Sequence, residues 1–137
     1  MIFDKEGRPE VLDKPMTNYV QSKVGSAWLA VEFGNRFHRT GVVSVSLHPG
    51  FISTELQRYL PAPAKVIMGL LFKPAVYGAY SELYAAFSPD VTVDDNGRYL
   101  MAWGRKAMLP RDIVQGMTDG GLEKLVRFCE ERMGASF

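Results

Sequence analysis

The sequence predicts an α/β fold in which helices alternate with parallel strands. A long amphipathic segment over residues 16–39 is followed by a short β-branched segment over residues 42–47, and a second helix and strand follow over residues 75–87 and 98–103. This alternation is typical of a doubly wound sheet with parallel strands. Two strands are too few for such a sheet, because both edges would stay unpaired. We therefore expect the chain to form the carboxyl-terminal part of a larger α/β domain, or to pair with a partner that supplies further strands.

The segment from Met16 to Arg39 predicts a long helix. It contains no proline, and its apolar side chains recur at the i, i+3, i+4, i+7 spacing of a buried helix face, at Val24, Ala27, Trp28 and Val31. We expect Thr17 or Asn18 to cap the amino terminus of the helix, and Gly41 to follow its end.

Shorter elements are expected on either side of this helix. Residues 1–15 are polar and interrupted by glycine and proline, so they predict a loop. The sequence VVSVSL at Val42–Leu47 is short, β-branched and bounded by glycine and proline, which favours a strand. One or two helical turns are expected at Thr54–Leu60, and a short helix at Ala64–Phe72.

The carboxyl-terminal half predicts a helix, a strand and a last helix. Ala75–Phe87 is free of proline and predicts the helix, and Arg98–Trp103 predicts the strand. The Asn96–Gly97 turn leaves an alternative open, in which this strand forms a hairpin with Val91–Val93. The last helix presents one apolar face made of Leu122, Leu125, Val126, Cys129 and Met133.

Composition excludes several classes of protein. The 137 residues are 47% apolar and 23% charged, as in one ordinary globular domain or less. Sixteen Lys and Arg against fifteen Asp and Glu give a net charge of +1, so we expect no nucleic-acid partner. The single cysteine, Cys129, cannot form an intramolecular disulfide, which fits a reducing, cytoplasmic setting.

The sequence gives no expectation of a secretory signal or a membrane span. The first ten residues carry acidic and basic side chains where a signal peptide needs an apolar stretch. The longest apolar run, Val66–Phe72, has seven residues, against about 20 that cross a bilayer.

Two sequence features are candidates for chemistry. Tyr19 and Lys23 are four residues apart, so a helix places them one turn apart on the same face. A Tyr-x-x-x-Lys sequence arises by chance in about one such chain in three, so the pair alone assigns no function. The second feature is SLHPGFISTEL at Ser46–Leu56, where a strand ends and the chain turns at once. Ligands of open α/β sheets bind just beyond the carboxyl ends of strands.

Taken together and in this order, YVQSK and GVVSVSLHPGFISTEL resemble the short-chain dehydrogenase/reductase superfamily. Residues 75–87 and the sequence NGRYLMAWGRK at Asn96–Lys106 are similar to the carboxyl-terminal part of its retinol-dehydrogenase-like and fungal members. The resemblance implies a Rossmann-type doubly wound sheet, with residues 1–137 as the carboxyl-terminal half of a single domain. It also implies an NAD or NADP cofactor and hydride transfer between that cofactor and a hydrophobic alcohol or carbonyl compound.

The resemblance also implies roles for individual residues. Tyr19 would be the general acid/base, and Lys23 would hold the nicotinamide ribose hydroxyls and favour ionisation of the Tyr19 phenol. The residues implied in cofactor binding are Lys23, Pro49 and Gly50 beside the nicotinamide, and Ile52 and Thr54 at its carboxamide or the neighbouring phosphates.

The chain departs from the family pattern in two respects. No glycine-rich phosphate-binding turn lies between a strand and a helix, and no serine precedes Ser22, so the family's catalytic serine has no counterpart. A second hypothesis therefore stays open, in which the chain is a truncated, non-catalytic remnant that acts as a binding or assembly module. The choice between NAD and NADP also stays open.

Other candidate residues have competing interpretations. The apolar run at Val66–Phe72 fits a lid over a lipophilic substrate, a surface resting on a membrane, or ordinary core packing. The helix face that begins at Val24 would fit a second copy of the chain, by analogy with the family.

No metal site is expected, because His38, His48 and the distant Cys129 lack the spacing of a zinc site. His48 lies beside the proposed nicotinamide site, and we expect a positional rather than a chemical role for it. Three tyrosines at helical spacing favour a packing stripe rather than a cofactor site: Tyr77, Tyr80 and Tyr84.

Overall fold

The computed structural model describes residues 1–54 and 61–134. Its helices are α1 (Pro15–Phe37), α2 (Ala62–Leu71), α3 (Val76–Phe87), α4 (Arg111–Gly116) and α5 (Leu122–Met133). Its strands are β1 (Ser46–Leu47), β2 (Ile52–Ser53), β3 (Lys73–Pro74), β4 (Tyr99–Met101) and β5 (Arg105–Ala107). The helical turns predicted at Thr54–Leu60 lie, beyond Thr54, outside the described residues.

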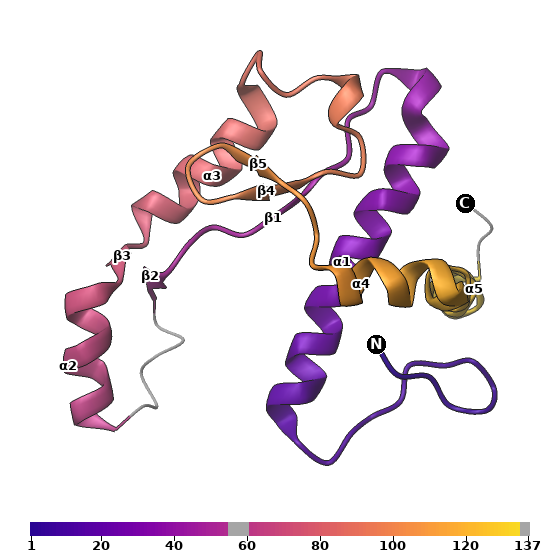
Figure 1. Cartoon of the computed structure of the whole chain (residues 1–137), viewed down its shortest axis with the longest axis horizontal. Helices are drawn as coiled ribbons and strands as arrows, with labels where there is room; N and C mark the ends of the chain where they lie inside the picture. Colours follow the sequence, from indigo (N-terminus) through magenta and orange to yellow (C-terminus); the bar gives the residue numbers. More distant parts are fainter. Residues whose placement is uncertain (55–60, 135–137) are drawn as a thin grey trace.

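The main sheet lies between α3 and α1, while α2 stands apart at one end of the molecule (Figure 1). Its strand order is β1-β4-β5, and β1 runs parallel to β4 with Ser46 beside Tyr99. The third strand, β5, is antiparallel to β4. A separate parallel pair joins β2 to β3. The predicted α/β class with parallel strands is confirmed, and β5 is an addition that the sequence did not indicate.

The strand predicted at Val42–Leu47 is shorter in the structure, where β1 covers only Ser46–Leu47. The residues before β1 face a turn instead of a strand. The Ser44 N–H donates to the side-chain oxygen of Asn96 at 2.6 Å, and the Ser44 carbonyl accepts from the Gly97 N–H at 2.8 Å. The Asn96 side chain thus takes the place of a strand partner.

The alternative hairpin between Val91–Val93 and the Arg98–Trp103 segment is wrong. Residues Val93–Asp95 form a 3₁₀ turn, and the Arg98–Trp103 segment contains β4, which pairs with β1 and β5. The hairpin that does form joins β4 to β5, and its turn contains Trp103 and Gly104, with φ angles of 64° and 80°. Residue type did not indicate this turn, because a tryptophan rarely adopts positive φ.

The long helix predicted from Met16 to Arg39 is confirmed as α1, and Gly41 follows the 3₁₀ turn at its end with a φ of 80°, but the predicted amino-terminal caps are wrong. The residue that precedes the helix is Lys14, and no side chain caps it. The Asn18 side chain instead binds the loop before the helix, accepting from the Leu12 N–H at 2.8 Å and donating to the Leu12 carbonyl at 2.7 Å.

Trp28 of α1 forms the centre of the core and is 1% exposed. Its indole N–H donates to the Ile113 carbonyl at 3.1 Å, and its ring stacks on that of Phe3 with centroids 6.5 Å apart. A Cβ atom on Gly121 would lie only 2.6 Å from the Trp28 ring, so this glycine makes room for the indole. The predicted buried face of α1 is therefore confirmed at Trp28, and it holds α4 and α5 against α1.

The helices predicted at Ala64–Phe72, Ala75–Phe87 and the carboxyl terminus correspond to α2, α3 and α5. Leu125 of the predicted apolar face of α5 is buried, whereas Met133 is exposed. The short helix α4 had no sequence signal. Within residues 1–54 and 61–134, no helix combines the length and apolar character needed to cross a membrane.

Candidate active site

A cavity of about 870 Å³ lies between α1 and the segment that follows β1. Its lining includes every site residue that the sequence predicted: Tyr19, Lys23, Pro49, Gly50, Ile52 and Thr54. The structure thus brings the two sequence motifs to one place. The volume falls within the range of about 300–1,000 Å³ of small-molecule sites.

The Tyr19 and Lys23 side chains lie together on the cavity face of α1. The Lys23 Nζ atom is 5.3 Å from the centroid of the Tyr19 ring. The nearby Ser22 hydroxyl donates to the Tyr19 backbone carbonyl at 2.7 Å, so it is turned toward its own helix. Among the described residues, neither the Tyr19 hydroxyl nor the Lys23 ammonium has a hydrogen-bond or ion-pair partner. Both polar groups can therefore bind a ligand.

The first half of the loop after β1 is held by backbone hydrogen bonds and by His48. The His48 N–H donates to the Leu100 carbonyl of β4 at 2.8 Å, and the Gly50 N–H donates to His48 Nδ1 at 2.9 Å. Gly50 has a φ angle of 97°, and a Cβ atom on it would lie 3.0 Å from Cβ of Ala102. The imidazole of His48 thus fixes the turn that places Pro49 and Gly50 in the cavity wall.

The second half of this loop is held by β3 and α3. The Lys73 N–H donates to the Phe51 carbonyl at 2.9 Å, and Ile52 pairs with Lys73 in the parallel β2-β3 ladder. On the other side, a Cβ atom on Gly78 of α3 would lie 2.7 Å from Ile52 Cδ1. The bare backbone of Gly78 therefore lets α3 approach the loop, and the approach sets the position of Ile52.

The cavity has lining residues that the sequence did not indicate. Burial raises the pKa of Tyr99, which lies at the start of β4 beside Ser46. The Ser46 hydroxyl oxygen is buried and has no hydrogen-bond partner among the described residues. The parallel pairing of β1 with β4 would have placed Tyr99 here, but Leu109, Pro110 and Ile113 carried no signal because the turn before α4 was not predicted.

The apolar run Val66–Phe72 divides into two parts. Phe72 lines the cavity and packs against Phe51, with ring centroids 5.6 Å apart. The α2 residues before it are exposed at Val66, Ile67, Leu70 and Leu71. Within the described residues, core packing therefore holds for Phe72 but not for these four side chains of α2.

The predicted tyrosine stripe of α3 is also only partly packed. Tyr84 packs against the hairpin, since a Cβ atom on Gly104 would lie 2.8 Å from its ring. Tyr77 contacts the rings of Tyr80 and Trp103, but Tyr77 and Tyr80 are both exposed. In residues 1–54 and 61–134 no three His, Cys, Asp or Glu side chains gather as a metal site would require.

The fold and the cavity define a class of protein, an α/β domain with a ligand-sized cavity beyond the carboxyl end of a parallel strand. Comparison with curated proteins identifies the family. The chain is 35% identical over 130 residues to a short-chain dehydrogenase/reductase of Pestalotiopsis fici, covering 93% of this chain and 40% of the relative. It is 35% identical over 129 residues to an uncharacterized oxidoreductase of Schizosaccharomyces pombe, covering 90% of this chain and 37% of the relative.

A short-chain dehydrogenase/reductase of Phomopsis amygdali is also 35% identical over 130 residues, covering 86% of this chain and 39% of the relative. The chain belongs to the short-chain dehydrogenase/reductases, a family of oxidoreductase enzymes. It spans about two fifths of the length of these three relatives. No family model and no solved structure matches it.

Proposed function

We propose that this chain is the carboxyl-terminal part of an NAD- or NADP-dependent oxidoreductase domain, with Tyr19 as its general acid/base. The observation that carries the proposal is the meeting of Tyr19 and Lys23 with the loop Pro49–Thr54 on one cavity. Both sequence motifs resemble those of the short-chain dehydrogenase/reductases, and the side chains of both line this cavity.

The residues present fit the nicotinamide end of a dinucleotide. Lys23 offers an unpaired ammonium that can donate to ribose hydroxyls. Gly50 lies in the cavity wall beside Pro49, and its φ angle of 97° gives the turn that places both residues there. Pro49 and Ile52 supply apolar surface for the ring, and Thr54 supplies a hydroxyl. The sequence has no glycine-rich turn for the phosphates, so this fit covers only one end of the cofactor.

The mechanism assigns one proton to Tyr19. A bound nicotinamide dinucleotide supplies or accepts the hydride. In alcohol oxidation, the Tyr19 oxygen removes the hydroxyl proton as the carbon loses hydride; in reduction, Tyr19 returns that proton to the carbonyl oxygen. The Lys23 ammonium lies over the Tyr19 ring, 5.3 Å from its centroid, so the two side chains can bind one ligand together.

We propose a hydrophobic alcohol or carbonyl compound as the substrate. Apolar side chains make up much of the cavity lining, including Val20, Phe51, Phe72 and Leu109. We also propose a cytoplasmic setting, supported by the single cysteine. By analogy with the family, we also propose a second copy of the chain as a partner, which sedimentation equilibrium would test.

Cofactor binding tests the site in the chain itself. We expect isothermal titration to show saturable binding of NADH or NADPH to the 137-residue chain. Lys23→Ala should weaken the binding at least about tenfold, since one charge-assisted hydrogen bond is worth about 1.5–3 kcal/mol. The control is Lys5→Ala in the amino-terminal loop, which should leave the affinity unchanged. Absence of binding to a folded chain would favour the non-catalytic alternative.

Turnover tests Tyr19. The chain is joined to the amino-terminal part of a curated relative, and Tyr19→Phe is compared with the parent. Loss of the general acid/base should lower kcat by about 10²–10⁴-fold. The matched control is Tyr80→Phe, which removes an exposed phenol outside the cavity. An unchanged kcat for Tyr19→Phe would show that Tyr19 is not the proton donor.

A further inference from the structure

The helix α2 exposes an apolar face that no described part of the chain covers. Val66, Ile67, Leu70 and Leu71 follow the i, i+1, i+4, i+5 spacing that places them on one side of a helix, and they are between 58% and 82% exposed. Figure 1 shows α2 at the end of the molecule, away from α1, α4 and α5. The face is therefore not the inner side of a helix packed on this core.

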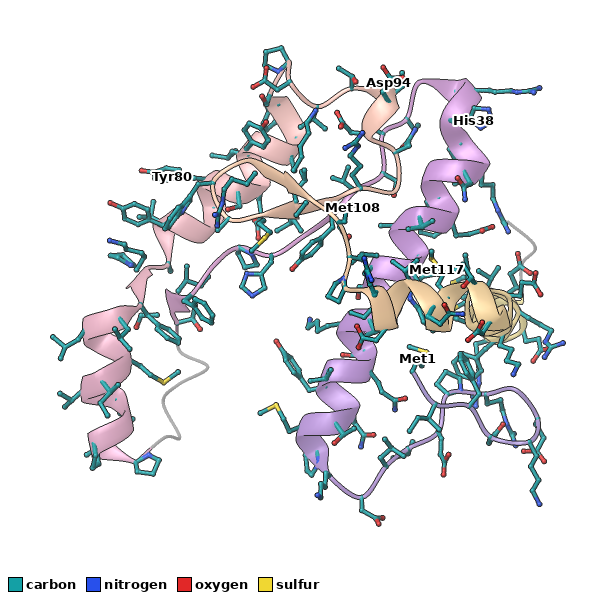
Figure 2. All side chains as sticks on the ribbon, viewed as in Figure 1. Met1, His38, Tyr80, Asp94, Met108 and Met117 are labelled. Carbon is teal, nitrogen blue, oxygen red and sulfur yellow. The ribbon has the colours of Figure 1, made fainter. Side chains whose placement is uncertain are left out.

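The helix α3 adds a second exposed stripe. Val76, Tyr80, Leu83 and Phe87 recur at i, i+4, i+7 and i+11, so they share one side of α3, and all four are exposed. Figure 2 shows Tyr80 projecting outward on the side of the view where α2 stands. We call these eight residues of α2 and α3 the outer apolar surface. The two stripes lie on helices that follow one another in the chain, and exposed apolar stripes of this size mark interaction sites.

The charges around this surface are mainly positive. Lys65 lies in α2 and Lys73 follows its end, and both are exposed. The helix α2 contains no acidic residue, and the one acidic residue of α3 is Glu82. Trp103 and Tyr77 lie beside Tyr80, with centroids 6.5 Å apart for Tyr77–Trp103 and 5.6 Å apart for Tyr77–Tyr80. Apolar side chains, flanking lysines and exposed Trp and Tyr together are the chemistry of a helix that lies in a membrane interface.

We propose that the outer apolar surface docks on an anionic lipid membrane, with Lys65 and Lys73 at the headgroups. The positive charge of the two lysines favours a lipid membrane over a second copy of the chain as the partner. Two copies pairing through the same surface would bring lysines toward lysines, whereas anionic lipid complements them. The attraction is local, because the whole chain has a net charge of only +1. The proposal does not depend on the oxidoreductase chemistry, although Phe72 places the cavity at the end of α2.

Vesicle flotation tests the proposal with the whole chain. We expect binding to vesicles of phosphatidylcholine and phosphatidylserine in about a 7:3 ratio, and much weaker binding to phosphatidylcholine alone. Lys65→Gln and Lys73→Gln should each lower the partition into the mixed vesicles about fivefold. Leu70→Glu should abolish flotation. The matched control is Met108→Glu, which replaces another exposed apolar residue, 90% exposed between β5 and α4, and should float like the parent.

The two tryptophans report which face meets the lipid. Trp103 is 55% exposed beside the proposed surface, whereas Trp28 is buried in the core. Brominated lipid should therefore quench Trp103 and leave Trp28 unquenched. The parent should lose fluorescence on binding brominated vesicles, and Trp103→Phe should not. Flotation without quenching of Trp103, flotation that survives Leu70→Glu, or absence of flotation overturns the proposal. A dimer that Leu70→Glu converts to a monomer, without lipid binding, would assign the surface to a second copy instead.

Discussion

The helices α1 and α2 use their apolar residues in opposite ways. In α1, Trp28 is enclosed by the Phe3 ring, the Ile113 carbonyl and the space left by Gly121. In α2, Leu70 is 82% exposed although the helix is the more apolar of the two. The difference shows that apolar content does not fix burial. A side chain is buried where other segments present a matching shape, and for Trp28 those segments are distant in sequence.

The largest expected effect removes the centre of the packed region. Trp28→Ala should lower the free energy of unfolding by about 3–5 kcal/mol, because it leaves a large cavity under α4 and α5. Urea unfolding followed by far-UV circular dichroism measures the loss. Trp103→Ala is the matched control and should cost far less, since Trp103 is half exposed. Equal losses at the two tryptophans would break the contrast between the two regions.

A second test concerns a buried charge beside the sheet. Asp95 is 2% exposed and accepts from Lys106 Nζ at 2.7 Å and from the Thr92 N–H at 3.0 Å. Its carboxylate also pairs with Arg98 Nε at 3.2 Å. The Lys106 ammonium, then the Thr92 N–H, holds the pKa of Asp95 below its usual value, against the opposing effect of burial.

Asp95→Asn should therefore destabilise the fold by about 1–3 kcal/mol at neutral pH. Because the pKa is lowered in the folded state, the carboxylate stabilises the fold above about pH 4, the ordinary value of an unfolded aspartate. That stabilisation disappears as the pH falls through the lower, folded value. The difference in unfolding free energy between parent and Asp95→Asn should thus shrink on acidification. The exposed Asp94, changed to Asn, should show a much smaller difference at every pH.

Sequence reasoning succeeded where one local pattern was sufficient. The helical periodicity around Trp28 predicted α1 and its buried face. The order of the Tyr19–Lys23 motif and the Pro49–Thr54 loop predicted residues that the structure gathers on one cavity. These features depend on residue type and spacing within a single segment.

Other features depend on contacts between segments and were not predictable. The length of β1 depends on the Asn96 side chain, which lies far along the chain. The hairpin turn depends on Trp103 adopting positive φ, which its residue type disfavours. The exposure of α2 was left open among three interpretations, because buried and exposed apolar faces have the same helical spacing.

The third test replaces one glycine in the loop after β1 and one in α2. Gly50→Ala forces an L side chain into a backbone with φ of 97° and toward Ala102, so we expect a loss of about 1–2 kcal/mol. Gly69→Ala in α2 meets no atom within 4 Å and should instead raise helix stability by about 0.5–1 kcal/mol. Thermal unfolding of both variants measures the two signs. A stabilised Gly50→Ala variant would show that the loop does not need this backbone conformation.

The smallest effect is expected at the most exposed leucine of α2. Leu70→Gln should change the free energy of unfolding by no more than about 0.5 kcal/mol, because the side chain touches solvent in the folded chain as it does in the unfolded one. Leu125→Ala, at a buried position of α5, should cost about 2–5 kcal/mol in the same urea experiment. A large loss at Leu70 would mean that another part of the protein covers α2 in solution. The same urea experiment on Leu70→Glu should also give a negligible loss, so that lost flotation of this variant reports on the surface alone.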